Sequence, residues 1–175
     1  KTVSNKTSEE LFVVLLDQNS LDWASSEMNW SWPWPRKAYG DILNFFKLGN
    51  AKTVTFDVIF SEPSLYGTED DSYFAQACKD FEKVVQIQYY DSSSTNQDIP
   101  ITSIDKISSN SAIQGNINSI PDSDSTIRRR RLFYNKNENE FPTLACATYL
   151  VSSDNFSKDD YLNTEEYSFL KNIKT

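Results

Sequence analysis

The stretch KTVTFDVIF, residues 52–60, decides the fold. Its β-branched and aromatic side chains favour a β-strand. Two further runs lie on either side of it, LFVVLL at residues 11–16 and KVVQIQYY at residues 83–90. Residues 11–16 are apolar without interruption, which is typical of a strand covered on both faces, as in parallel sheets. The three runs therefore predict three strands.

Helical patterns fill both intervals between these strands. Pro35 suits the first position of a helix, and apolar residues then recur on one face until Gly49, a typical end. Acidic residues 69–71 suit a helix N-terminus, and apolar residues with helical spacing continue to Phe81. Alternating strands and helices predict two consecutive βαβ units. We therefore expect an α/β fold of three layers with a mostly parallel sheet.

The second half of the chain has weaker patterns. Residues 91–112 are polar and repetitive, which is typical of an exposed loop, and we assign no chemistry to them. Residues 126–134 are typical of a strand, and NKNENE at 135–140 of a connection. Pro142 suits the start of a third helix that reaches about Val151. An antiparallel strand pair added to the sheet is consistent with this pattern.

Length and composition limit the functions that this chain can have. Its 175 residues suit one domain, so we expect residues 11–175 to form a single domain after a flexible start at residues 1–10. Its net charge of −8 is unsuited to a nucleic-acid partner, which requires a basic surface. The chain has no His, which excludes Ser-His-Asp and Cys-His catalysis and imidazole metal sites. We expect no cofactor.

Three further features concern membrane spans, the start of the chain and the cysteines. No run approaches the ~18 apolar residues of a membrane span. The chain begins with Lys1 and not with Met, and we expect it to be a piece of a longer protein. Cys78 and Cys146 lie among small or apolar neighbours. Buried free thiols are therefore favoured, with a disulfide as the alternative.

Three acidic residues lie near the ends of the predicted strands: Asp17, Asp57 and Glu62. The carboxyl ends of parallel strands meet at one edge of a sheet. The three carboxylates are therefore candidates for an oxygen-rich Mg²⁺ or Ca²⁺ site. A metal-dependent hydrolase or phosphotransfer enzyme using Asp17 and Asp57 is thus an alternative function. We favour a structural role, in which Asp57 pairs with a cation or accepts backbone hydrogen bonds and the other two order loops.

The pentapeptide WPWPR begins at Trp32 and ends at Arg36. Its prolines restrict the backbone, so the indoles of Trp32 and Trp34 are held at low entropic cost. In one interpretation the indoles form a lid or wall for a ligand, and Arg36 binds a carboxylate or phosphate. In the interpretation that we favour, the tryptophans cap the core and Arg36 pairs with Asp17 or Asp57.

Arg128 opens a run of four arginines. Such runs indicate anionic ligands or lipid headgroups in some proteins. On a strand, however, Arg128 and Arg130 face one way and Arg129 and Arg131 the other, so the four charges do not form one patch. We favour a solvated or acid-paired strand and keep Arg128 as a binding candidate.

Two sets of motifs together resemble the CHASE-two family, the second type of cyclase- and histidine-kinase-associated sensory extracellular domain. The first set combines an apolar run ending in Asp17, WPWPR, and FDVIFSEPS at residues 56–64. The second set is a weaker block in the later half of the chain. The resemblance covers about residues 11–150. Its other residues are Ser20, Leu21, Tyr39, Asp70, Asp71, Phe74 and Ala75 in the first set, and 115–118, Asp122, Asp124, Arg128, Arg129 and 142–145 in the second.

The resemblance implies an extracytoplasmic sensor, periplasmic or extracellular, in a membrane-anchored bacterial receptor. The implied output is a cytoplasmic adenylate cyclase, histidine kinase or similar domain, and the sensor itself has no catalytic residues. Its signal is an unknown small molecule or protein. A homodimer is a further expectation, and a dimerisation module without a small ligand is a further alternative.

The sequence departs from the family pattern in two places. Family members usually have a glycine after the second acidic residue of the later block, where this chain has Ser125. They also commonly continue into another strand-bearing segment after the third helix. We therefore expect part of the family fold to lie beyond Thr175.

Overall fold

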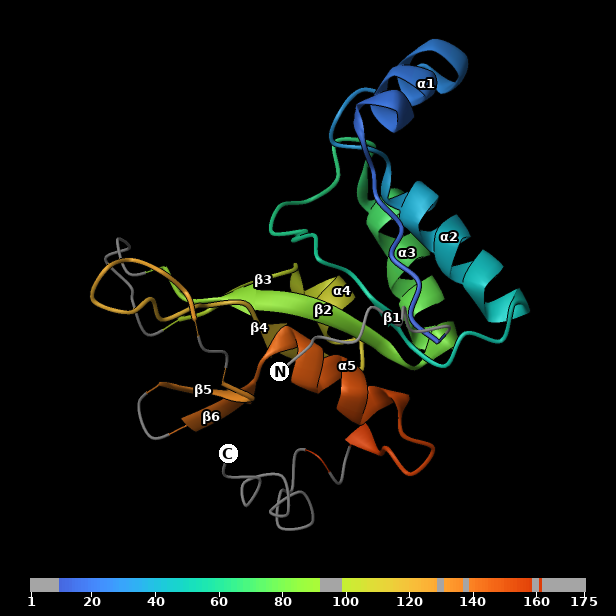
Figure 1. Ribbon diagram of the computed structural model, residues 1–175. Helices are drawn as coiled ribbons and strands as arrows, with labels where there is room; N and C mark the ends of the chain where they lie inside the picture. Colours follow the sequence, from blue (N-terminus) through green and yellow to red (C-terminus); the bar gives the residue numbers. More distant parts are fainter. Residues whose placement is uncertain (1–9, 92–98, 129–130, 137–138, 159–160, 162–175) are drawn as a thin grey trace. The chain divides into compact units, whose positions relative to one another are not determined.

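The computed structural model contains two compact units, one ending at Trp34 and the other beginning at Pro35, and each is described by itself. The elements of each unit are labelled in Figure 1. The prediction of a single domain over residues 11–175 stays a prediction. The residues that the structure describes are 10–91, 99–128, 131–136, 139–158 and 161.

Among its described residues, the first unit contains one helix, α1 (Gln18–Met28). Asp17 caps it: Oδ1 accepts hydrogen bonds from the backbone N–H and the hydroxyl of Ser20, both at 2.9 Å. These bonds stabilise the carboxylate and lower the pKa of Asp17. Asn29 ends the helix in the left-handed region, which Asn tolerates better than most residues.

The prediction of a strand at residues 11–16 is wrong. These residues have no regular secondary structure and pair with no strand in the described part of the chain. An apolar run shows only that burial is favourable. A strand also needs a neighbour that supplies hydrogen-bonding partners. The exposed fractions are 63–83% for Leu11, Phe12, Val13, Val14 and Leu15.

Two helices of the second unit, α2 (Arg36–Leu48) and α3 (Thr68–Phe81), pack side by side and confirm the two predicted helices (Figure 1). Gly40 lets them approach, because a Cβ there would lie 2.7 Å from Cε1 of Tyr73. A cluster of four aromatic rings packs beside them, with ring centroids 4.9–6.2 Å apart. Its members are Tyr39, Phe56, Phe60 and Phe74.

The main sheet is mixed. Its central strand is β2 (Val84–Tyr89), which is buried along most of its length. The short strand β1 (Val54–Thr55) and the later strand β4 (Ile113–Asn116) pair with it in parallel. A third neighbour, β3 (Ile101–Thr102), pairs antiparallel with its carboxyl end. One βαβ unit, β1–α3–β2, is therefore present, but two consecutive units in three layers are not confirmed.

The strand predictions differ in their outcome. Residues 83–90 contain β2, as predicted, whereas only two residues of the predicted 52–60 strand form β1. The expectation of a plain exposed loop at 91–112 is wrong in part. Its later half contains β3 and α4 (Asp105–Ser108), and Ile107 is fully buried. Residues 92–98 of that prediction lie outside the described residues.

Helix α5 (Leu144–Ser152) packs against β2 and β4 (Figure 1). Gly115 makes this close approach feasible, because a Cβ there would lie only 2.6 Å from the Cα of Leu144. The contact fixes the N-terminus of α5 beside the carboxyl end of β4. The buried cluster behind it consists of Val85, Ala112, Ile113, Ala147 and Val151.

A separate antiparallel hairpin joins β5 (Phe133–Lys136) to β6 (Asn139–Pro142). It contains the later part of the strand predicted at residues 126–134, but it forms a sheet of its own and is not added to the main sheet. Residues 126–128 are not strand. The predicted third helix is present as α5, but it begins at Leu144 because Pro142 ends β6. The hairpin contacts the end of β2 through Tyr90, whose ring stacks on Tyr134 at 5.8 Å.

Both cysteines are buried free thiols, as predicted. Burial raises the pKa of Cys78 to about 12 and also raises the pKa of Cys146. Both side chains are therefore protonated at neutral pH.

Candidate functional site

Arg36 is a buried structural residue. It is 7% exposed, and its Nε lies 3.5 Å from Oδ1 of Asp71, which is 3% exposed. Its Nη2 donates to the carbonyl of Glu62 at 3.0 Å. Its guanidinium lies 4.5 Å from the centre of the Phe60 ring. The expected pairing of Arg36 with Asp17 or Asp57 is wrong, because α3 brings Asp71 to this position instead.

The neighbouring acid, Asp70, holds the start of α2. Its two carboxylate oxygens accept the backbone N–H groups of Arg36 at 2.6 Å and of Lys37 at 2.7 Å. Pro35 has no side chain that could cap this helix, so an acid from α3 supplies the missing partner. Ser64 joins the network: its hydroxyl donates to Asp70 and its backbone N–H to Asp71. The acids of the first family motif therefore connect α2, α3 and the loop before α3.

The three acids expected at the strand ends do not form the metal site that was the alternative to a structural role. Asp17 caps α1, as described above. Glu62 is exposed and contributes its backbone carbonyl, not its carboxylate, to the bond with Arg36. No group of three or more His, Cys, Asp or Glu side chains in the described part of the chain is arranged to hold a metal ion.

The tryptophan segment lies in the first unit. Trp32 is exposed and precedes a cis peptide bond to Pro33. Trp34 is buried, and its ring centroid lies 6.0 Å from that of Trp30. The lid and core-cap roles of Trp32 and Trp34 stay predictions.

Arg128 is paired with acids, as we favoured. Its Nη1 and Nη2 donate to the two carboxylate oxygens of Asp124 at 2.8 and 2.7 Å, and Nη1 also lies 3.3 Å from Asp122. The pairing lowers the pKa of Asp124 to about 2. Ser125 in the same turn has φ +63°, in the left-handed region that favours glycine. The glycine that we expect here from the family resemblance would adopt this conformation without strain.

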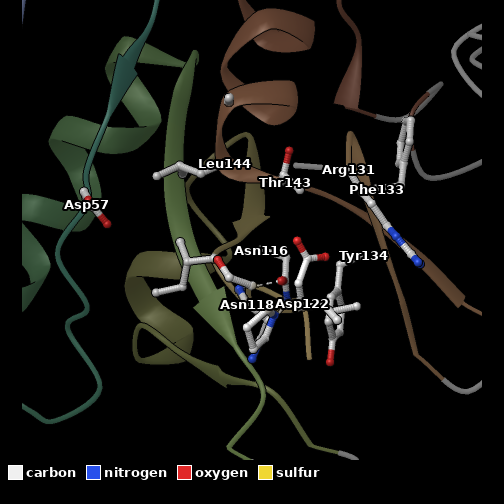
Figure 2. A pocket seen from close by; sticks show the side chains of 14 residues that line it. Asp57, Asn116, Asn118, Asp122, Arg131, Phe133, Tyr134, Thr143 and Leu144 are labelled. Carbon is white, nitrogen blue, oxygen red and sulfur yellow. Dashed lines mark hydrogen bonds between the residues drawn. The ribbon is translucent and has the colours of Figure 1, made fainter. Parts of the chain in front are cut away.

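A pocket of about 620 Å³ lies at the carboxyl end of β4 (Figure 2). Ligands of α/β sheets typically bind at this edge, and pockets of about 300–1,000 Å³ are usual for small molecules. Its walls come from the segment after β1, the loop after β4, the hairpin and the start of α5. They comprise Asp57, 116–122, Arg131, Phe133, Tyr134 and 143–145.

Hydrogen bonds fix the floor of this pocket. The Asn118 side chain accepts from the backbone N–H of Tyr90 at 2.8 Å and donates to the Tyr90 carbonyl at 2.9 Å. The buried Asn116 side chain accepts from the N–H of Asn118 and donates to the Asn118 side chain, a bond drawn in Figure 2. The loop after β4 is therefore tied to the end of β2.

The N-terminus of α5 forms another wall. Thr143 forms an isolated parallel bridge with Asn116 and precedes the helix without a side-chain capping hydrogen bond. Leu144 and Ala145 of the first turn also line the pocket. Since the first N–H groups of a helix have no partner within the helix, this wall is favourable for an anionic group.

Two charged side chains of the pocket have no side-chain hydrogen bond or ion pair in the described structure: Asp57 and Arg131. Both are exposed, and they lie on opposite sides of the pocket in Figure 2. The third charged residue, Asp122, pairs with Arg128. Neither structural partner expected for Asp57 is therefore present, and the pocket carries one open carboxylate and one open guanidinium.

Of the predicted site residues, the pocket contains only Asp57. Trp32, Trp34 and Asp17 belong to the first unit, and Arg36 is enclosed between helices. The other residues of the pocket were not predicted as site residues, but one feature of the sequence could have identified many of them. Half of the pocket positions belong to the second block of the family resemblance: Asn116, Ile117, Asn118, Asp122, Thr143, Leu144 and Ala145.

Comparison with known proteins gave one result. The family model described as the CHASE2 domain matches residues 2–173, nearly the whole chain. No curated protein and no solved structure matches the chain. In the described part of the chain, no helix has both the length and the apolar character needed to cross a membrane.

Proposed function

Because the chain belongs to the CHASE2 domain family, we propose that it is the sensory part of a membrane-anchored signalling receptor. The family is one of sensory extracellular domains that are not themselves catalytic, and the match over residues 2–173 carries the proposal. The proposal places the chain outside the cytoplasm, in a bacterial receptor with flanking membrane helices. Its output is a cytoplasmic adenylate cyclase, histidine kinase or similar domain.

The pocket is the part of the chain that receives the signal in this proposal. It lies at the sheet edge where ligands of α/β folds bind, and two of its charged groups have no side-chain partner among the described residues. Its walls come from four separate segments, so a bound ligand would connect the sheet, the hairpin and α5. A ligand that binds one arrangement of these segments better than another shifts their balance, which is what a sensor requires.

Cysteine labelling in whole cells tests the location. Cys78 and Cys146 are buried, so Lys79→Cys on the exposed face of α3 supplies one reactive thiol. In the full-length protein we expect a membrane-impermeant maleimide to label this thiol in intact cells. The unsubstituted protein is the control and should stay unlabelled. Labelling that requires permeabilised cells would contradict the extracytoplasmic location.

Occlusion of the pocket tests the sensing role. Ile120 lines the pocket and is 58% exposed, so Ile120→Trp adds bulk at its wall without disturbing a packed core. Ile99 is 60% exposed and does not line the pocket, which makes Ile99→Trp a matched control. In the full-length receptor we expect Ile120→Trp to fix the output at one level, while Ile99→Trp keeps the normal response. Equal responses of the two variants would contradict the proposal.

A homodimer remains part of the proposal and is tested separately. The exposed apolar side chains of Phe45 and Leu48 near the end of α2 favour contact with a second copy. Analytical ultracentrifugation of the chain should detect a dimer that Phe45→Ser with Leu48→Ser weakens. A monomer at every concentration would contradict it.

A further inference from the structure

We propose that the pocket binds a zwitterion, with an ammonium group at Asp57 and a carboxylate at Arg131. This inference rests on the proposed sensory function and specifies its ligand. Both side chains line the pocket, and neither has a hydrogen bond or ion pair in the described structure. Their charges are opposite, yet they do not neutralise one another. A ligand with one charge of each sign satisfies both.

The carboxylate end of the ligand is assigned to Arg131. A guanidinium presents a planar fork of N–H donors that matches a carboxylate. The N-terminus of α5 lines the same pocket at Thr143, Leu144 and Ala145 and adds unpartnered N–H groups and the positive end of the helix dipole. Arg131 is also the only cationic side chain among the described residues that line the pocket.

The ammonium end is assigned to Asp57. Its carboxylate is exposed to the pocket and has no cation beside it in the described structure. The other acidic lining residue, Asp122, has Arg128 as its partner. Asp57 is therefore the acidic group best placed to bind a cation that the protein itself does not supply.

The separation of the charges limits the ligand further. Asp57 and Arg131 lie on opposite sides of the pocket, with apolar residues such as Ile117, Ile120 and Leu144 in the same lining (Figure 2). A simple α-amino acid carries its two charges on one carbon. The arrangement therefore favours a molecule whose ammonium and carboxylate are separated by several bonds, such as an ω-amino acid or a short peptide with free ends.

Calorimetric titration of the whole chain with a series of small molecules tests this inference. The ligands are 6-aminohexanoate, trialanine and glycine, with hexanoate and hexylamine as single-charge controls. We expect 6-aminohexanoate or trialanine to bind at least about tenfold more tightly than either single-charge control, because each charge-assisted contact contributes about that factor. The tighter of the two identifies an ω-amino acid or a peptide as the source. Glycine should bind more weakly than both.

Charge-removing variants assign each end. Asp57→Asn should weaken 6-aminohexanoate at least about tenfold but leave hexanoate unchanged, and Arg131→Gln should weaken it similarly but leave hexylamine unchanged. Glu62→Gln and Lys79→Gln make the same charge changes on exposed residues outside the pocket and should have no effect. Unchanged far-ultraviolet circular dichroism and melting temperature establish that each variant is folded.

Three outcomes would overturn the inference. One is hexylamine or hexanoate binding as tightly as the zwitterions. Another is Asp57→Asn and Arg131→Gln binding the zwitterions as the unsubstituted chain does. The third is no binding by any zwitterion. If Ile120→Trp still abolishes the receptor's response in that case, the sensory function stands and only the ligand class is wrong.

Discussion

The contact between α2 and α3 and the pocket at the carboxyl end of β4 contain the same kinds of charged residue, but these residues have different partners. In the first, Arg36 and Asp71 are enclosed, and each carboxylate of Asp70 and Asp71 accepts backbone hydrogen bonds. In the second, Arg131 is exposed, lines the pocket together with Asp57, and has no side-chain partner among the described residues. The comparison teaches that a conspicuous motif can serve stability, while the binding site that we propose lies where charged side chains lack partners among the described residues.

The largest effect is expected from Arg36→Ala. This change leaves the buried carboxylate of Asp71 without its cation and removes the bond to the Glu62 carbonyl. The free energy of unfolding should fall by about 3–5 kcal/mol, as for other broken buried pairs. Urea denaturation followed by circular dichroism measures it.

The matched control is Arg128→Ala, which breaks an exposed pair with Asp124. It should lower the free energy of unfolding far less than Arg36→Ala does, because exposed ion pairs contribute little. If Arg36→Ala lowers the free energy of unfolding by less than about 1 kcal/mol, the buried pair of Arg36 and Asp71 does not hold the structure together.

A smaller effect is expected from Gly115→Ala, which acts on the pocket side. The added Cβ would meet the backbone of Leu144 at 2.6 Å, so the N-terminus of α5 must shift. Overpacking of this kind costs about 1–3 kcal/mol. Thermal melts measure the loss, and hydrogen exchange should show faster exchange at residues 143–147.

Gly49→Ala provides the control for that change. Its Cβ would lie 3.5 Å from the nearest atom, the Phe46 carbonyl oxygen, which is an ordinary contact. We expect no loss of stability from Gly49→Ala. If the two alanine variants melt at the same temperature, α5 does not depend on close contact with β4.

Ser125→Gly should stabilise the turn that follows the pocket. A residue with a side chain at φ +63° costs about 1–2 kcal/mol relative to glycine, and part of this gain is lost to the greater freedom of glycine in the unfolded chain. The net gain should be about 0.5–1 kcal/mol. Ser123→Gly, at a position whose φ is not positive, should bring no gain. Equal melting shifts for both variants would contradict this account of the family glycine.

The smallest effect concerns the pH dependence of Asp124. Its pKa of about 2 lies below the ordinary value of 3.8, because Arg128 stabilises the carboxylate. The folded state therefore binds this proton less readily than the unfolded state. The resulting contribution to stability is present above about pH 4 and is lost as the pH falls through about 2. NMR titration of the carboxyl carbon should give the low pKa in the unsubstituted chain and a higher pKa in Arg128→Gln, because the hydrogen bonds from Arg128 are lost while those from Thr126 remain. Equal values would show that the pair does not form in solution.

Much of the fold was predictable from residues with a clear period. The apolar spacing after Pro35 and the acidic start at residues 69–71 predicted α2 and α3. Helices can be predicted in this way because their hydrogen bonds and side-chain spacing involve residues close together in the sequence. Strands depend on partners that lie far away in the sequence. For that reason residues 11–16 were assigned wrongly, and β4, whose sequence IQGN is neither alternating nor apolar throughout, was missed.

The site was less predictable for a similar reason. The acidic pair at residues 70–71 reads as a helix start, but its hydrogen bonds to Arg36 and Ser64 exist only once α2 and α3 are packed. Arg131 reads as one of four similar arginines, and only the structure shows that it lines a pocket while Arg128 pairs with acids. Whether a charge is satisfied is a property of the folded chain and not of the residue type.

Charged residues between α2 and α3 stabilise the fold, whereas those of the pocket, as we propose, bind a ligand. Hydrogen exchange in the presence and absence of 6-aminohexanoate is the most direct test of this difference. The account predicts slower exchange at residues 116–122 and 143–147, which surround the pocket, and unchanged exchange at residues 36–48 and 68–81. Protection confined to α2 and α3, with the loop after β4 unaffected, would contradict it.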